Sequence, residues 1–179
     1  MANTTTSSSD ATTTSAASAD TLTLPATISL DVPSSGVVGE SPTLQVAIDT
    51  DTVLTGGDGN DILVGGSGND NLDAGEGDDI LIGGGGSNTH QGGDGEDIFG
   101  HAAGASDTVI DFSVEDDKLS VSEGLTVTST AQGTVQVDQG TGATDQAAQI
   151  ITFSDGSTLA LVGVTEEFST DWLTGGASA

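Results

Sequence analysis

The sequence predicts an all-β protein organised around a block of short tandem repeats. Runs of alternating polar and apolar residues, which are typical of strands, lie on both sides of the block, for example in residues 43–54 and 149–164. No long stretch has the apolar spacing of an amphipathic helix. Between the flanks, residues 56–100 divide into five nine-residue copies without insertion or deletion.

The copies share one pattern of glycine, aspartate and apolar residues. They read GGDGNDILV, GGSGNDNLD, AGEGDDILI, GGGGSNTHQ and GGDGEDIFG. Position 6 holds an acid or its amide, and position 8 is apolar except at His90. A sixth, degenerate copy, AAGASDTVI, follows after one or two extra residues and places Asp107 and Val109 in register. Position 8 is expected to point inward from a very short strand.

These residue types suit a hard divalent cation. Glycine lets the backbone turn sharply and direct carbonyl oxygens inward, and the position-6 side chain supplies a carboxylate where each loop ends. Calcium takes six to eight such oxygens. The candidate calcium ligands are Gly56, Asp58, Asp61, Gly65, Ser67, Asp70, Gly75, Gly77, Asp79, Gly84, Gly86, Asn88, Gly93, Gly95, Asp97 and Asp107.

The motif G-G-x-G-x-D-x-U-x resembles the calcium-binding nonapeptide of the RTX (repeats-in-toxin) family, over roughly residues 50–165. The resemblance implies a parallel β-roll of about five to six repeats, two per turn, which binds about three to five Ca²⁺ ions. Asp61, Asp79 and Asp97 would then stack on one side, and Asp70 and Asn88 on the other, with Asp107 beside Asn88. Family members are typically exported from Gram-negative bacteria by type I secretion, with an uncleaved signal near the C-terminus.

Charge and composition exclude several partner classes. The formal net charge is −27, and Lys118 is the only basic side chain among lysine and arginine. Nucleic acid binding needs clustered Lys and Arg, and no apolar run approaches the ~20 residues of a membrane span, so we expect neither nucleic acid binding nor membrane insertion. There is no cysteine. Residues 1–20 lack the basic and apolar regions of a Sec signal peptide.

The pattern divides the chain into four parts. Residues 1–20 are predicted to form a disordered tail, 21–55 N-terminal β segments, 56–110 the RTX β-roll, and 111–179 a C-terminal β region with the secretion signal. The sequence SDG at 154–156 reads as a hairpin turn. The segment 166–173 predicts a short helix.

The predicted function is a calcium-binding secreted protein, located outside the cell or at its surface, whose repeats fold on binding Ca²⁺ and which has a structural or interaction role. An alternative is an adhesive, biofilm-matrix or surface-layer component that assembles with calcium, through self-association or an anionic polysaccharide. A hydrolase or carbohydrate-modifying enzyme is disfavoured, and no catalytic residue is assigned. The acids Asp111, Glu115, Asp116 and Asp117 read as a solvated turn or a peripheral calcium contact.

One outer face of the predicted coil is apolar. Odd-numbered copies place Ile62, Val64, Ile80, Ile82 and Ile98 at positions 7 and 9, whereas even-numbered copies place polar residues there. Two interpretations stay open: the flanking β segments cover this face, or it is a surface for self-association or for a partner.

Overall fold

The computed structural model describes residues 27–31, 42–47, 50–138 and 142–174. Two sheets of seven strands each face one another, and the described part of the chain contains no α-helix. The first sheet has the order β1-β2-β4-β6-β8-β10-β14 and the second β11-β12-β13-β9-β7-β5-β3. The strands are β1 (Thr27–Asp31), β2 (Thr43–Ala47), β3 (Val53–Asp58), β4 (Ile62–Val64), β5 (Asn71–Glu76), β6 (Ile80–Ile82), β7 (Thr89–Asp94), β8 (Ile98–His101), β9 (Ser106–Val109), β10 (Lys118–Val121), β11 (Val127–Val137), β12 (Thr144–Phe153), β13 (Thr158–Val162) and β14 (Leu173–Thr174).

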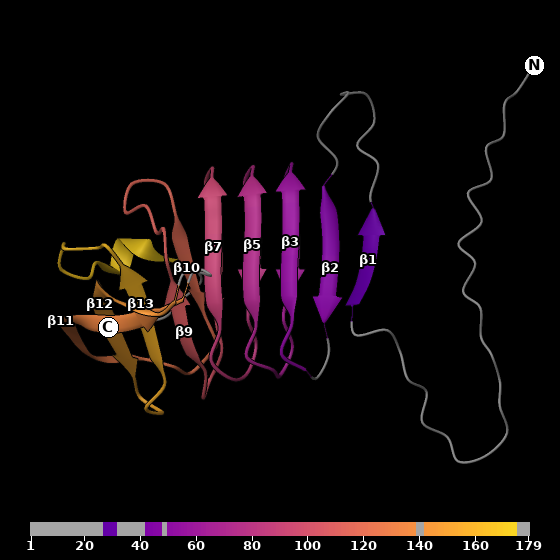
Figure 1. Ribbon diagram of the computed structural model, residues 1–179. Coiled ribbons are helices and arrows are strands. Elements are labelled where there is room, and N and C mark those ends of the chain that lie inside the picture. Colours follow the sequence, from indigo (N-terminus) through magenta and orange to yellow (C-terminus); the bar gives the residue numbers. More distant parts are fainter. Residues whose placement is uncertain (1–26, 32–41, 48–49, 139–141, 175–179) are drawn as a thin grey trace, which may run out of the picture.

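The repeats form a parallel coil, as the sequence predicts. The chain alternates between the sheets, so β3, β5 and β7 lie side by side in one of them (Figure 1). Pairing partners are 18 residues apart, for example Ile62 with Ile80 and Leu72 with His90. Each turn of the β-roll therefore contains two nonapeptides.

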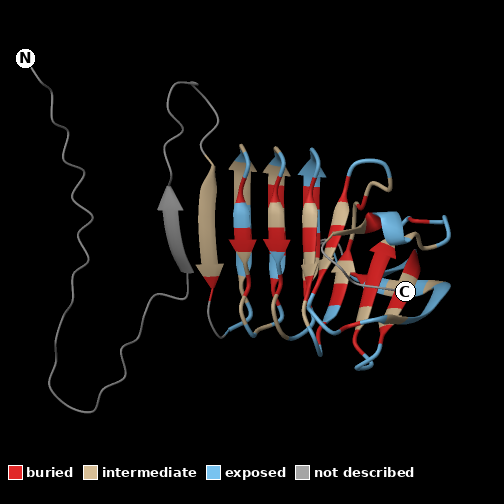
Figure 2. Cartoon of the chain, turned by 180° about the vertical axis from the view of Figure 1, so that it is seen from behind, coloured by how far each residue is buried: buried red, intermediate tan, exposed pale blue. Residues whose placement is uncertain are grey.

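The core of the coil is a narrow stack of position-8 side chains. Leu63, Leu72, Leu81 and Phe99 are 0–1% exposed, and His90 occupies the same stack. Buried and exposed residues alternate along the short strands (Figure 2). This is the expected inward direction of position 8, because successive side chains of a strand point to opposite faces.

Both flanks extend the sheets. β1 pairs antiparallel with β2, and β2 continues the first sheet by parallel pairing with β4. At the other end, β11, β12 and β13 form an antiparallel unit that joins the coil through β13 and β9. The turn at Gly156, with φ of +87°, connects β12 and β13 and confirms the predicted hairpin.

The C-terminal region also adds to the coil. β10 pairs parallel with β8, and β14 pairs parallel with β10, so the parallel stacking runs past residue 110. The predicted short helix is a single 3₁₀ turn, Thr170–Trp172. The predicted tail at 1–20 and the last residues, 175–179, lie outside the described part of the chain.

The outer face of the first sheet keeps apolar surface exposed. Ile62 and Ile82 are 38% and 39% exposed. The flanking strands pair along the ends of this sheet, so the described residues leave these two side chains partly exposed. No helix in the described part of the chain is long and apolar enough to cross a membrane.

Candidate metal centre

Position-6 side chains stack into two columns, one along each edge of the coil. We call Asp61, Asp79, Asp97 and Asp117 the Asp61 column, and Asp70, Asn88 and Asp107 the Asp70 column. In the Asp61 column each Oδ1 accepts a hydrogen bond from the backbone N–H one rung earlier, at 2.6 Å from Asp61 to Asp79 and at 2.9 Å from Asp79 to Asp97. The Asp70 N–H donates to Asn88 Oδ1 in the same way, at 2.9 Å. Each rung thus holds the loop of the previous turn.

The second carboxylate oxygen of three rungs has no partner. Asp61, Asp70 and Asp79 are 1–3% exposed, and the Oδ2 atom of each is buried without a hydrogen bond in the structure. A buried charged oxygen without a partner is strongly unfavourable. These three atoms are therefore where a cation would be most stabilising.

The glycines make room for such a cation. A Cβ built on Gly56 would overlap Asp61 Oδ2 and the carbonyl oxygen of Ala74 one turn on, and one built on Gly65 would overlap Asp70 Oδ2 and the Gly83 carbonyl oxygen. Free carboxylate oxygens and backbone carbonyl oxygens of adjacent turns therefore converge beside position 1. Oxygen atoms of these two kinds are what calcium prefers.

Backbone oxygen is essential to this site. Among the residues that the structure describes, no three acidic or histidine side chains gather closely enough to hold a metal ion. A cation beside Asp61, Asp70 or Asp79 would be held by the carboxylate together with glycine-loop carbonyls. The donor set therefore fits calcium and does not fit a transition metal that needs several imidazole or thiolate ligands.

The candidate residues at positions 2, 3 and 4 line the loops rather than the columns. Positive φ angles occur at Gly75, Gly77, Gly84, Gly86, Gly93 and Gly95, and each of these residues stacks against a carbonyl oxygen of the preceding turn. Asp58 lines a cavity of about 150 Å³ with Glu76 and Gly77, and Ser67 is exposed on the other edge. Which of these oxygens coordinate calcium stays a prediction.

Two acids that the sequence analysis assigned to a solvated turn or a peripheral calcium contact accept backbone hydrogen bonds from the coil. Asp117 is 3% exposed, and its Oδ1 accepts from the Asp97 N–H at 2.9 Å, so it is a rung of the Asp61 column. Asp111 accepts from the N–H groups of Gly92 and Gly93 at 3.1 and 3.0 Å. The available signal was the sequence DKLSV, in which Leu119 follows Asp117 at the repeat spacing and is fully buried.

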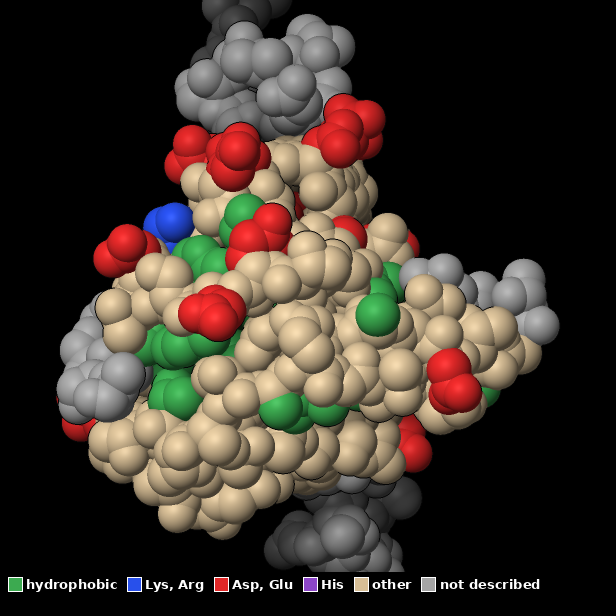
Figure 3. Space-filling model, turned by 90° about the vertical axis from the view of Figure 1, so that its left-hand side faces the viewer, with side chains coloured by type: hydrophobic (Ala, Val, Ile, Leu, Met, Phe, Trp, Pro, Cys, Tyr) green, Lys and Arg blue, Asp and Glu red, His purple; other side chains and the backbone are tan. Residues whose placement is uncertain are grey.

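Burial and neighbouring negative charges raise the pKa values of two acids in the Asp61 column. Asp and Glu side chains are scattered over the C-terminal end of the molecule, where the chain's one lysine gives the only basic colour on the visible face (Figure 3). Burial, with a contribution from the charge of Asp61, raises the pKa of Asp79 to about 6. Burial, with contributions from the charges of Asp117 and Asp79, raises the pKa of Asp97 to about 7.

We expect acid to stabilise the calcium-free coil. Since the folded-state pKa values of Asp79 and Asp97 lie above the ordinary 3.8, the folded coil binds protons that the unfolded chain releases. Its stability therefore rises as pH falls from about 7 towards 4. Far-UV circular dichroism in EDTA should show more β-structure at pH 5 than at pH 7.5.

His90 opposes this trend, because burial lowers its pKa from 6.5 to about 4, so the folded state loses stability as pH falls through that range. The β-content at pH 5 and at pH 7.5 is therefore best compared in a His90→Leu variant, which lacks this opposing effect. Equal or smaller β-content at pH 5 in that variant would contradict the assignment of raised pKa values to these carboxyls.

His90 is itself an imperfection of the core. It is fully buried, and neither ring nitrogen has a hydrogen-bond partner in the structure. We expect His90→Leu to raise the free energy of unfolding by about 1–3 kcal/mol, because it removes unsatisfied polar atoms and restores the apolar stack. Urea unfolding in excess calcium measures this change. Leu72→His, one turn earlier in the same stack, should have the opposite effect, and a less stable His90→Leu protein would reveal a role for the imidazole.

The comparisons with known proteins agree with this geometry. The sequence profile of the RTX calcium-binding nonapeptide repeat (4 copies) matches residues 55–89. The chain is similar to the solution structure of the AlgE6R3 subunit from the Azotobacter vinelandii mannuronan C5-epimerase, with 26% identity and a TM-score of 0.51 over 72% of this chain and 80% of that chain. No curated protein sequence matches the chain.

A second solved structure shares the fold. The crystal structure of extracellular lipase LipA from Serratia marcescens has 20% identity and a TM-score of 0.50, and the match covers 74% of this chain and 21% of that one. The chain thus corresponds to about a fifth of the lipase, and the likeness concerns the fold alone. Taken with the five nonapeptides and the unpartnered carboxylate oxygens, the matches show that the repeats of this chain are RTX calcium-binding nonapeptides and that the protein is a calcium-binding β-roll.

Proposed function

We propose that the protein is a secreted, non-enzymatic structural protein whose coil folds when it meets extracellular calcium. The observation that carries this proposal is the set of buried, unpartnered Oδ2 atoms of Asp61, Asp70 and Asp79. The chain has one lysine and no arginine against 28 acids, so its own side chains supply almost no positive charge. A divalent cation is the partner that these oxygens require.

Calcium concentration would then act as a compartment signal. Extracellular modules bind calcium with Kd values of about 10⁻⁴–10⁻³ M. A site exposed to ten times its Kd stabilises the folded state by about 1.4 kcal/mol, and three such sites by about 4 kcal/mol. That is enough to decide between folding and unfolding for a coil with so thin a core. Outside the cell the coil would be folded, whereas at cytosolic calcium it would be unfolded and suited to export as an extended chain, as in type I secretion.

A calcium titration of the EDTA-stripped protein tests the proposal. Far-UV circular dichroism should show a cooperative gain of β-structure at submillimolar to millimolar calcium. Magnesium is the control, because it demands near-octahedral geometry and gives up its water reluctantly. A protein that is fully folded in EDTA and unchanged by calcium would overturn the folding switch.

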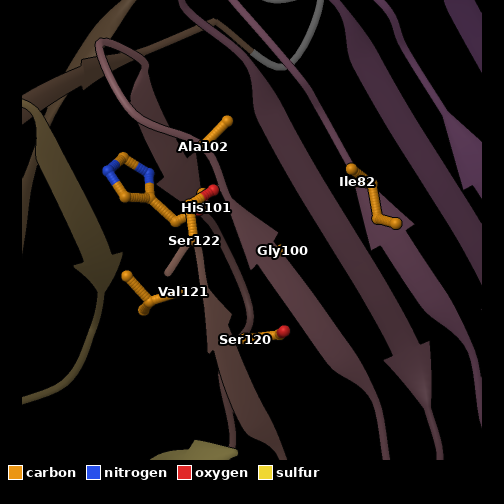
Figure 4. Close-up of a pocket in the computed structure, with 7 residues that line it drawn as sticks. All are labelled: Ile82, Gly100, His101, Ala102, Ser120, Val121 and Ser122. Carbon is orange, nitrogen blue, oxygen red and sulfur yellow. Dashed lines mark hydrogen bonds between the residues drawn. The ribbon is translucent and has the colours of Figure 1, made fainter. Parts of the chain in front are cut away.

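Calcium-dependent assembly is a second candidate, favoured by the outer face of the first sheet. Ile62 and Ile82 are exposed there, and Ile82, Gly100 and Ser120 are among the residues that line a depression of about 160 Å³ (Figure 4). This face exists only in the folded coil, so a second copy of the chain would bind it only when calcium is present. Light scattering should then show larger particles in calcium, and fewer for Ile82→Asp. A monomer at every calcium concentration would reject this candidate; an anionic polysaccharide bound through calcium is the remaining alternative.

One hydrogen-bond chain has the order of a hydrolase triad but fits a structural role. His101 joins Asp107, at 2.6 Å, to the Ser157 hydroxyl, at 3.0 Å. Ser157 is 5% exposed, and its hydroxyl donates to Asp155 at 2.6 Å. A serine nucleophile must present its oxygen to a substrate, and this oxygen is occupied and enclosed. We therefore assign these residues to the connection between the coil and the C-terminal hairpin.

A further inference from the structure

The loop of the fourth repeat, residues 83–88, differs from the other loops at the atom that would face calcium. In the first, second and fifth loops, a Cβ built on the position-1 glycine would overlap the Oδ2 atom of Asp61, Asp70 or Asp97. The equivalent Cβ on Gly83 would instead overlap Asn88 Nδ2. An N–H donor thus occupies the place of a carboxylate oxygen.

The hydrogen bonds fix this orientation of the Asn88 amide. Its Oδ1 accepts from the Asp70 N–H at 2.9 Å, which only an oxygen can do. Its Nδ2 must then be the inner atom, and it donates to Asp107 Oδ1 at 2.8 Å and to the Gly85 carbonyl oxygen at 3.3 Å. Flipping the amide would bring an N–H against an N–H and an oxygen against a carboxylate.

Both carboxylate oxygens of the next rung, Asp107, already have a polar partner. Asp107 is 2% exposed; its Oδ1 accepts from Asn88 and its Oδ2 faces His101 Nδ1 at 2.6 Å. His101 is held in turn by Ser157 and by stacking on Phe153, with ring centroids 4.6 Å apart. By contrast, the Oδ2 of Asp70, two rungs before Asp107 in the same column, has no partner.

We propose that the place beside position 1 of the fourth loop binds no calcium and that the Asn88 amide takes the ion's place there, closing the loop onto Asp107 and, through His101, onto the C-terminal hairpin. The Gly83 carbonyl oxygen of this loop still faces the site beside Asp70. Calcium is thereby confined to loops whose position-6 aspartate keeps Oδ2 free. The coil has a calcium-dependent Asp61 column, whereas its Asp70 column ends in a metal-free closure. This inference rests on the proposed calcium binding and specifies which loops carry it.

Calcium stoichiometry of the full chain tests the proposal. Native mass spectrometry in calcium, supported by calorimetry, counts the ions bound by wild type, Asn88→Asp, Asn88→Ala and Asn69→Asp. Asn88→Asp should bind one more ion than wild type, because it puts a carboxylate oxygen where the amide nitrogen now lies. Asn69→Asp is the matched control: it adds the same charge in the same half of the coil at an exposed position, where Oδ1 still accepts from the Ser87 N–H, and its count should equal that of wild type.

Asn88→Ala decides the question even if Asn88→Asp does not fold. Its ion count should equal that of wild type, while its melting temperature in calcium falls because the closure is lost. Loss of one ion from Asn88→Ala, or no gain in a folded Asn88→Asp, would overturn the inference and leave the proposed function standing. A wild-type protein that binds no calcium would overturn the proposed function, and this inference with it.

Discussion

Gly93→Ala is expected to unfold the coil even in saturating calcium. Gly93 has a φ of +102°, and a Cβ there would lie inside the van der Waals radius of the Gly75 carbonyl oxygen in the turn below. No rotamer can relieve an overlap between a Cβ and backbone, so the turns would have to separate. Separation breaks the parallel pairing and removes carbonyl oxygens from the calcium loop. We expect a loss above about 4–5 kcal/mol, which is exceptional for one methyl group and comparable to the whole stability of a small domain.

Gly57→Ala is the control for this substitution. Gly57 occupies the same position of the first copy with a φ of +127°, but nothing lies within 4 Å of its Cβ. It therefore carries the backbone strain without the overlap, about 1–2 kcal/mol. Circular dichroism and urea unfolding in calcium should separate the two variants clearly. Equal losses would mean that backbone strain, and not the contact between turns, makes these glycines necessary.

Asp79→Asn is expected to have opposite effects with and without calcium. The amide oxygen can still accept from the Asp61 N–H, as Asp79 Oδ1 does at 2.6 Å, but the charge that faces the ion is lost. Calcium affinity depends on the number of charged ligands, so the calcium midpoint should rise about tenfold or more, equivalent to about 1.4 kcal/mol. In EDTA the variant should be more ordered than wild type, because burial disfavours the Asp79 charge and raises its pKa to about 6.

Asp78→Asn is the matched control, since Asp78 is the exposed neighbour whose Oδ1 accepts from the Glu96 N–H. It removes the same charge from the outside of the same loop, so its calcium midpoint should stay close to that of wild type. The two midpoints come from parallel circular dichroism titrations. If both variants shift equally, the net charge of the chain and not the column position governs calcium binding.

The five nonapeptides were sufficient to predict the coil because their geometry is local and periodic. Glycines at fixed offsets set the turns, and an apolar residue at position 8 sets the inward face, so Leu63, Leu72 and Leu81 could be assigned to the core before any contact was known. Pairing at 18 residues follows from two such units per turn. Asp117 could not be predicted in this way because it lies 20 residues after Asp97 and not 18. The irregular linker between them breaks the sequence period, although the backbone still places Asp117 in register with the column.

Sequence alone determined that this chain repeats, that its repeats suit calcium, and that its charge needs a cation. It could not tell which oxygens remain free, because that depends on partners distant in the chain. Asp107 is engaged by Asn88, 19 residues away, and by His101, whose other nitrogen meets Ser157, 56 residues away. Only the tertiary structure distinguishes a carboxylate with an unpartnered oxygen from one whose oxygens already have hydrogen-bond partners, because both are aspartates at the same position of the repeat.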